Sequence, residues 1–93
     1  MNYLKKKYLY NFLVNQGFND TLKLKDFEYQ YYRGDEWLKS DDIDLYCVRQ
    51  KEIYVSIYLY DEELDKRIET NRYAFHKQNN TWLKTYERKR KVI

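Results

Sequence analysis

The clearest pattern in the chain is a strict alternation of aliphatic with aromatic or hydroxyl side chains. The odd positions are Ile53, Val55, Ile57 and Leu59, and the even positions are Tyr54, Ser56, Tyr58 and Tyr60. Side chains alternate between the two faces of a strand, whereas a helix would not separate these two sets. The pattern predicts a central strand over residues 52–60, with one aliphatic face and one tyrosine-lined face.

Residues 43–48 alternate in the same way, which predicts a neighbouring strand. A three-residue loop, 49–51, keeps like faces together, whereas a two-residue loop would mix them. The predicted pairs are Cys47 with Ile53, Leu45 with Val55, Ile43 with Ile57, and Tyr46 with Tyr54 on the other face.

The N-terminal residues 2–16 have the spacing of an amphipathic helix. The apolar stripe consists of Leu4, Tyr8, Leu9, Phe12 and Leu13. Asn2 can cap the start of this helix, and Gly17 lies where a left-handed residue would end it. A helix at the N-terminus is therefore predicted.

Residues 21–33 are predicted to be extended. Leu22 and Leu24 occupy even positions whereas Phe27, Tyr29 and Tyr31 occupy odd ones. A bulge near residues 25–26 would bring both sets to one face; otherwise residues 21–25 form a separate short segment. Residues 33–35 read as a turn around Gly34.

A second hairpin is predicted from strands 72–78 and 81–88 around a two-residue turn, because asparagine tolerates positive φ. Its predicted pairs are Tyr73 with Tyr86, Phe75 with Lys84, Lys77 with Trp82, and Arg72 with Glu87. Residues 36–40 fit either a strand or a short helical turn. Residues 61–71 fit a short helix or a charged loop, and residues 88–93 form a basic tail.

Together these elements predict a single α+β domain, with the N-terminal helix packed on one face of an antiparallel sheet of four to five strands. The predicted core joins the apolar stripe of the helix to the aliphatic side chains of the two central strands. Those strand residues are Ile43, Leu45, Cys47, Ile53, Val55, Ile57 and Leu59.

The composition narrows the setting. Cys47 is the only cysteine and falls in a strand pattern, so we expect a buried thiol in a reducing compartment. No apolar run reaches the length of a signal peptide or a membrane span, which predicts a cytoplasmic protein without a membrane partner. Abundant Tyr, Lys, Asn and Ile are typical of AT-rich codons. This favours a low-GC bacterium, or a phage or plasmid of one.

The formal net charge of +3 is unevenly distributed. Basic residues gather at the two ends: Lys5, Lys6 and Lys7, then Arg88, Lys89, Arg90 and Lys91. Removing these seven from the 18 basic residues leaves 11 against 15 acidic residues, so residues 8–87 carry −4. The basic ends are candidate contacts for phosphates, although a nucleic-acid-binding protein usually has a basic face across its fold.

The main candidate binding surface is the aromatic face formed by Tyr46, Tyr54, Tyr58 and Tyr60. Three interpretations stay open: a structural, half-exposed face; a protein-binding surface, since tyrosine is enriched at interfaces; and a stacking surface for single-stranded nucleic acid. A protein partner ranks above nucleic acid, and a small-molecule ligand is not indicated.

Catalytic and metal-binding motifs are not found. One histidine and one cysteine cannot supply a zinc site without carboxylates, and the acidic clusters lack the calcium-loop spacing. We therefore predict no catalytic residue, metal or cofactor. One enzyme alternative is a small ribonuclease-type toxin, for which the candidate residues are Arg72, His76, Tyr86 and Arg88.

The sequence thus favours a non-enzymatic binding protein. Its small size and origin suggest an accessory protein of a mobile genetic element that engages, and could inhibit, a host or phage macromolecule. Single-stranded nucleic-acid binding and the ribonuclease-type toxin are the two alternatives.

Overall fold

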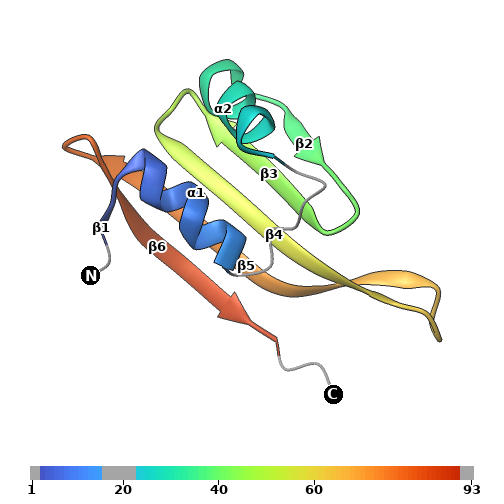
Figure 1. Ribbon diagram of the computed structural model, residues 1–93. Coiled ribbons are helices and arrows are strands. Elements are labelled where there is room, and N and C mark those ends of the chain that lie inside the picture. Colours follow the sequence, from blue (N-terminus) through green and yellow to red (C-terminus); the bar gives the residue numbers. More distant parts are fainter. Residues whose placement is uncertain (1–2, 16–22, 91–93) are drawn as a thin grey trace.

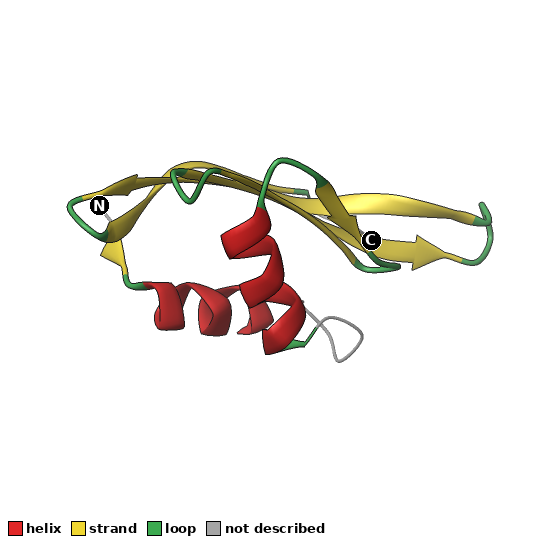
Figure 2. Cartoon of the chain, turned by 90° about the horizontal axis from the view of Figure 1, so that it is seen from above, coloured by secondary structure: helices red, strands yellow, loops and turns green. Residues whose placement is uncertain are grey.

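A computed structural model describes residues 3–15 and 23–90 of the chain. Its elements are β1 (Tyr3–Leu4), α1 (Lys6–Asn15), α2 (Leu24–Arg33), β2 (Trp37–Lys39), β3 (Ile43–Val48), β4 (Glu52–Asp61), β5 (Lys66–Gln78) and β6 (Thr81–Lys89). The strands form one antiparallel sheet in the order β1-β6-β5-β4-β3-β2 (Figure 1). Both described helices lie on the same face of it (Figure 2). The predicted α+β class is confirmed.

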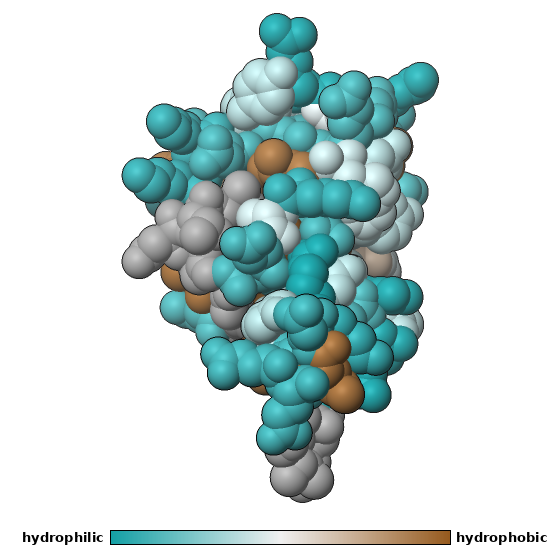
Figure 3. Space-filling view, turned by 90° about the vertical axis from the view of Figure 1, so that its right-hand side faces the viewer, coloured by the Kyte–Doolittle hydropathy of each residue, from teal (hydrophilic) through white to brown (hydrophobic). Residues whose placement is uncertain are grey.

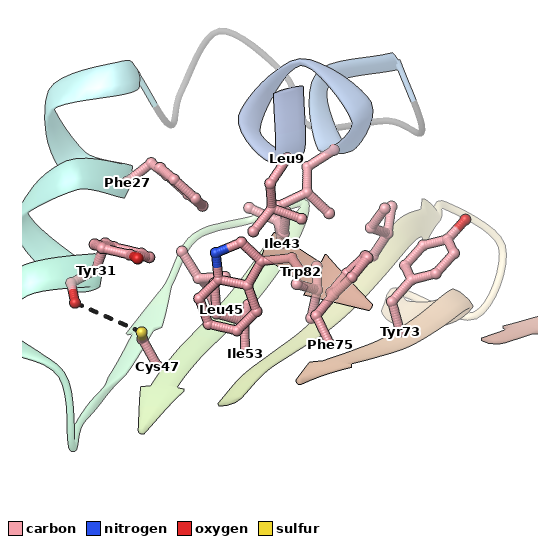
Figure 4. Packing of buried hydrophobic residues seen from close by; sticks show 13 residues of the cluster. Leu9, Phe27, Tyr31, Ile43, Leu45, Cys47, Ile53, Tyr73, Phe75 and Trp82 are labelled. Atoms are coloured by element: carbon pink, nitrogen blue, oxygen red, sulfur yellow. Dashed lines mark hydrogen bonds between the residues drawn. The ribbon is translucent and has the colours of Figure 1, made fainter. Parts of the chain in front are cut away.

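One hydrophobic core fills the space between the helices and the sheet (Figure 4). Leu9 and Leu13 from α1 and Phe27 and Tyr31 from α2 pack against the helix-facing side chains of the strands. The strand residues of this core are Ile43, Leu45, Cys47, Ile53, Val55, Ile57, Tyr73, Phe75 and Trp82. Neither described helix is long and apolar enough to cross a membrane.

The hairpin of β3 and β4 has the predicted register. Cys47 pairs with Ile53 and Leu45 with Val55, while Tyr46 lies opposite Tyr54. The positive φ angles of Arg49 and Gln50 form the turn within the predicted three-residue loop. This prediction is confirmed because only one register places every aliphatic side chain of both strands on one face.

The predicted strand over residues 21–33 is wrong where the structure describes it, because residues 24–33 form α2. Phe27, Gln30 and Tyr31 are buried, and their spacing of three and four residues is that of a helix face. The change from even to odd apolar positions near residue 25 reflects this helical period and not a bulge in a strand. Residues 21 and 22 lie outside the described residues.

The helix predicted over residues 2–16 is shorter at its start. Tyr3 and Leu4 instead form β1, which pairs with Leu83 and Trp82 at the edge of β6. A strand at this edge satisfies backbone groups of β6, which a helix would leave unpaired. Tyr8, expected in the core, is exposed. The predicted end at residue 16 and the roles of Asn2 and Gly17 lie outside the described residues.

Neither alternative for residues 61–71 is right. Residues 58–61 of β4 pair only with residues 66–69 of β5, forming a two-stranded projection that we call the arm. The carboxylate of Asp61 accepts hydrogen bonds from the backbone N–H groups of Glu63 and Leu64, which fixes the turn at the tip. The arm extends past the helices (Figure 1), so Leu59 is exposed rather than part of the core. Between α2 and β3, the strand alternative for residues 36–40 is correct.

Two bulges adjust the registers of β5 and β6. Thr70 is the extra residue at the step between Ile57 and Tyr58, and Thr85 is the extra residue at the step between Ala74 and Phe75. The hydroxyl of Thr70 donates to the carbonyl of Ile57 at 3.2 Å, and that of Thr85 donates to the carbonyl of Ala74 at 3.3 Å. Each threonine therefore bridges the irregularity to which it belongs.

The second bulge corrects half of the predicted β5–β6 register. The turn at Asn79–Asn80 and the pairs Lys77 with Trp82 and Phe75 with Lys84 are confirmed. Beyond Thr85 the register shifts by one residue. Tyr73 therefore pairs with Glu87 rather than Tyr86, and Arg72 pairs with Arg88 rather than Glu87.

Candidate functional site

The face of the sheet opposite the helices carries a line of aromatic side chains that crosses five strands. Successive cross-strand partners are Trp37 with Tyr46, Tyr46 with Tyr54, Tyr54 with Ala74, and Ala74 with Tyr86. We call these five residues the aromatic row. Side chains paired across adjacent strands stand close together on one face. The ring centroids of Trp37 and Tyr46 lie 5.1 Å apart.

A second line of cross-strand partners runs beside the aromatic row, two residues further along each strand. It comprises Lys39, Asp44, Ser56, Arg72 and Arg88, and we call it the polar row. Beside these rows lies an open groove of about 790 Å³. It is lined by all five residues of the aromatic row, by every member of the polar row except Arg88, and by Tyr58 and Glu69. An aromatic floor bordered by charged side chains is suited to binding and orienting another molecule.

Glu69 organises one end of this groove. Its carboxylate accepts bonds from Nε of Arg72 at 3.2 Å and from Nη2 of Arg72 at 3.0 Å, and a further bond from Arg88. Burial of the carboxyl group raises its pKa. The hydrogen bonds from Arg72 and Ser56, and the charges of Arg72 and Arg88, lower it by more, so the pKa of Glu69 lies below its ordinary value. Glu69 is thus a fixed negative charge between two guanidinium groups.

Arg67, which pairs with Tyr60 in the arm, connects the arm to the β2–β3 side of the groove. Its guanidinium lies 3.8 Å from the ring centroid of Tyr58 and forms a 3.1 Å ion pair with the buried Asp44. It also donates to the backbone carbonyls of Ser40 and Asp41. Burial, followed by the charge of Asp44, raises the pKa of Tyr58. These contacts hold the arm in one direction relative to the sheet.

Three of the four predicted aromatic candidates lie together in the groove, namely Tyr46, Tyr54 and Tyr58. Tyr60 lies outside it, on the arm, where its hydroxyl bonds to the carboxylate of Asp65. The hydrogen bond to Glu52 is the main cause that raises the pKa of Tyr54.

The sequence-based prediction did not place Trp37 or Tyr86 on the aromatic face, although it named Tyr86 as a candidate for the ribonuclease-type alternative. The strand alternative for residues 36–40 would have placed Trp37 opposite Tyr46 if the loop before β3 had been read as a hairpin turn. No signal in the sequence marked the bulge at Thr85, which carries Tyr86 to the side of Ala74.

The two basic ends are not brought together. Leu4, next to Lys5, pairs with Trp82, whereas Arg88 lies six residues further along β6, which is about 20 Å of strand. Lys6 and Lys7 lie over tyrosine rings of the helical layer, and Lys5 is exposed. Arg88 and Lys89 form ion pairs with glutamates, Arg90 is exposed at the end of β6, and Lys91 lies outside the described residues.

The residues suggested for a ribonuclease-type site are only partly grouped. Arg72, Tyr86 and Arg88 share the groove face, but His76 lies four residues from Arg72 along β5, about 13 Å away, and is close to Glu52. The Cys47 thiol is buried against the carbonyl of Tyr31 (Figure 4), and burial raises its pKa. No metal-binding group of three or more His, Cys, Asp or Glu residues is found in residues 3–15 and 23–90.

The surface at the end where the arm projects is mostly hydrophilic (Figure 3). Hydrophobic colour is confined there to small, separate spots among pale and hydrophilic residues. At this end of the molecule the described side chains therefore form no broad aliphatic patch, and a contact made there would depend on aromatic and charged groups.

No protein-family model matches the chain, and neither a curated protein nor a solved structure matches it significantly. The site is therefore interpreted from its own geometry.

Proposed function

We propose that this chain is a cytoplasmic, non-enzymatic binding protein that holds one protein partner on the bare face of its sheet. The observation that supports this proposal is the aromatic row, which lies within an open groove on the face that no described helix covers. A half-exposed tyrosine face needs no function by itself. A row of four aromatic side chains in register, bordered by charged side chains, is more than core packing requires.

The composition of the groove resembles that of tight protein interfaces. Tryptophan, tyrosine and arginine supply most of the binding free energy at such interfaces. Here Trp37 and Tyr46 contact one another, and Arg72 is fixed by Glu69. Because these side chains are already ordered, less conformational entropy is lost when a partner binds.

The charges of this face favour a protein over single-stranded nucleic acid. The groove and its borders carry four cationic side chains, Lys39, Arg67, Arg72 and Arg88, and three carboxylates, Asp44, Glu52 and Glu69. The three arginines are all paired with carboxylates. A nucleic-acid strand needs a succession of cations for its phosphates, which these pairs do not offer.

The suggested biological setting follows from composition. We propose an accessory protein of a phage or plasmid that engages a host or phage protein, with occlusion of that partner's surface as the simplest way to inhibit it. The broad groove face of the described residues is consistent with this role.

The test combines affinity purification from a low-GC host, with and without nuclease, with two groove variants and one control. Trp37→Ala and Tyr54→Ala remove exposed members of the aromatic row, whereas Tyr29→Ala removes an even more exposed tyrosine on α2. We expect a partner that survives nuclease treatment and whose purified form binds each groove variant at least about tenfold more weakly, but binds Tyr29→Ala normally.

Two results would contradict the proposal. One is capture that disappears with nuclease, together with salt-sensitive binding of the purified protein to oligonucleotides, which would favour the nucleic-acid alternative. The other is equal weakening by Tyr29→Ala, which would place the contact outside the groove.

A further inference from the structure

Two arginines on neighbouring strands share one carboxylate at the end of the groove. Arg72 and Arg88 are direct cross-strand partners, and both bond to Glu69. Like charges directly opposite each other on a sheet destabilise it. One carboxylate offsets only part of that repulsion, so the cluster keeps a net positive charge.

The exposure of the three side chains is unequal. The Glu69 side chain is only 13% exposed, whereas those of Arg72 and Arg88 are 52% and 48% exposed. The carboxylate thus lies beneath and the guanidinium groups lie above it, toward solvent. The acid positions the arginines without closing the surface of the groove.

Both guanidinium groups retain hydrogen-bond donors. Each has five N–H donors in a planar fork that suits carboxylate and phosphoryl oxygens. Arg72 uses Nε and Nη2 for Glu69, and Arg88 uses Nη2. The phenol rings of Tyr58 and Tyr86 line the same groove as Arg72 and add hydroxyl groups nearby.

We propose that Arg72 and Arg88 form a preorganised binding site for one oxyanion, a carboxylate or phosphoryl group presented by the partner. This inference rests on the proposed function, because it assigns the chemistry of one contact in the groove. The aromatic row then holds the apolar part of the same segment of the partner.

The site accommodates one anionic group and not a chain of them. Continuing along the polar row from Arg72, the next residues are Ser56 and Asp44, and the carboxylate of Asp44 is already paired with Arg67. Lys39 is at the far end of the row. A second phosphate next to the first would therefore approach a carboxylate.

The test is an NMR titration of the intact chain without any partner, observed at the arginine Nε–Hε groups. The probes are inorganic phosphate, O-phosphoserine and N-acetyl-aspartate amide, each at a constant ionic strength set with chloride. We expect saturable shifts at Arg72 and Arg88 with dissociation constants on the order of millimolar. Comparison of the two amino-acid probes identifies phosphoryl or carboxylate groups as the preferred source.

The variants are conservative so that the fold is kept. Arg72→Lys and Arg88→Lys retain the charge but lose the planar fork, and each should weaken binding of the preferred probe by about tenfold. Arg33→Lys, at an exposed position on α2, is the matched control and should leave the titration unchanged.

Linear shifts of equal size at Arg33, Arg72 and Arg88 would overturn the anion site, because they would show general screening of surface charge. Unchanged binding of the preferred probe in both Arg72→Lys and Arg88→Lys would overturn it as well. This outcome can be told apart from failure of the proposed function, since the titration needs no partner. If Tyr54→Ala loses partner binding but the titration shows no response to anions, the proposed function stands and only the anion site is disproved.

Discussion

Glu69 illustrates how one side chain can serve both stability and binding. Its carboxylate is mostly buried, and its two arginine partners lie on different strands. A carboxylate that gains such partners on folding is more acidic in the folded state than in the unfolded chain. Its contribution to stability is therefore present above the pKa of the unfolded state and is lost as the pH falls through the lowered pKa of the folded state.

We predict that Glu69→Gln destabilises the protein at neutral pH and that the difference from wild type shrinks as the pH falls below 4.5, the ordinary pKa of glutamate. Urea unfolding at a series of pH values measures this difference. Glu28→Gln, at an exposed position on α2, is the control and should differ little from wild type at any pH. A difference that stays constant or grows toward acid would contradict the role assigned to Glu69.

Two aliphatic residues of β4 should respond very differently to truncation. Ile57 is 4% exposed and Leu59 is 52% exposed, although both have the same place in the alternating pattern. Ile57→Ala should cost about 2–5 kcal/mol in unfolding free energy, because it leaves a cavity beneath the helices. Leu59→Ala should cost no more than about 0.5 kcal/mol. Equal costs in urea unfolding would disprove the boundary between core and arm.

At the scale of elements, the transition from α2 to β2 depends on Gly34. Its N–H donates to the carbonyl of Gln30 at 2.8 Å, which ends the helix. Its φ of +60° is combined with an extended ψ, a conformation open almost only to glycine. A Cβ atom there would lie 2.7 Å from the carbonyl oxygen of Cys47.

Gly34→Ala should therefore destabilise the protein by at least about 1–3 kcal/mol, the usual cost of such backbone strain. Asp35→Gly is a useful comparison, because Asp35 also has a positive φ, which glycine adopts without strain. It should change the stability little. Thermal unfolding of both variants followed by circular dichroism checks the prediction, and an unperturbed Gly34→Ala would show that the turn can adopt another conformation.

The elements that could be predicted from sequence are those in which the hydrophobic pattern of one strand matches that of the strand it pairs with. The β3–β4 hairpin was predicted in register because Leu45 and Val55 share the aliphatic face that the core needs. The helix α2 was missed because its short run of aromatic residues fits two periods, and only the packing of Phe27 and Tyr31 decides between them. In the arm, residues 58–60 of β4 lie within the predicted strand, whereas residues 66–69 of β5 were missed because three of these four residues are charged and carry no periodic signal.

At the scale of the whole molecule, the sheet is continuous from β2 to β1 and shares one core with both described helices. The same continuity explains why the candidate site was only partly predictable. Tyr46 and Tyr54 follow from one hairpin, but Trp37 and Tyr86 join them only when five strands are assembled with the correct registers.

We predict a single cooperative unfolding transition. In a Trp37→Phe variant the remaining tryptophan is the buried Trp82, so fluorescence reports the core while far-ultraviolet circular dichroism reports the whole sheet. The two probes should give coincident urea transitions. Separate midpoints would mean that part of the sheet unfolds independently of the core.

The two threonine bulges bear on how the length of this chain can change during evolution. Deleting a residue from a strand normally reverses the facing of every residue beyond it. Thr85 is an exception: without it, Lys84 and Tyr86 would simply follow one another in a regular ladder, and their partners Phe75 and Ala74 would be unchanged. Thr70 is likewise the extra residue of the bulge in β5, so its loss would also leave the neighbouring pairs unchanged. Deletion of Thr85 should therefore leave a folded protein. Deletion of Tyr54 should not, because it would turn the buried Val55 and Ile57 away from the core, and nuclear magnetic resonance spectra of the two variants would show the difference. Single-codon losses in natural variants of this chain are accordingly expected at these two threonines.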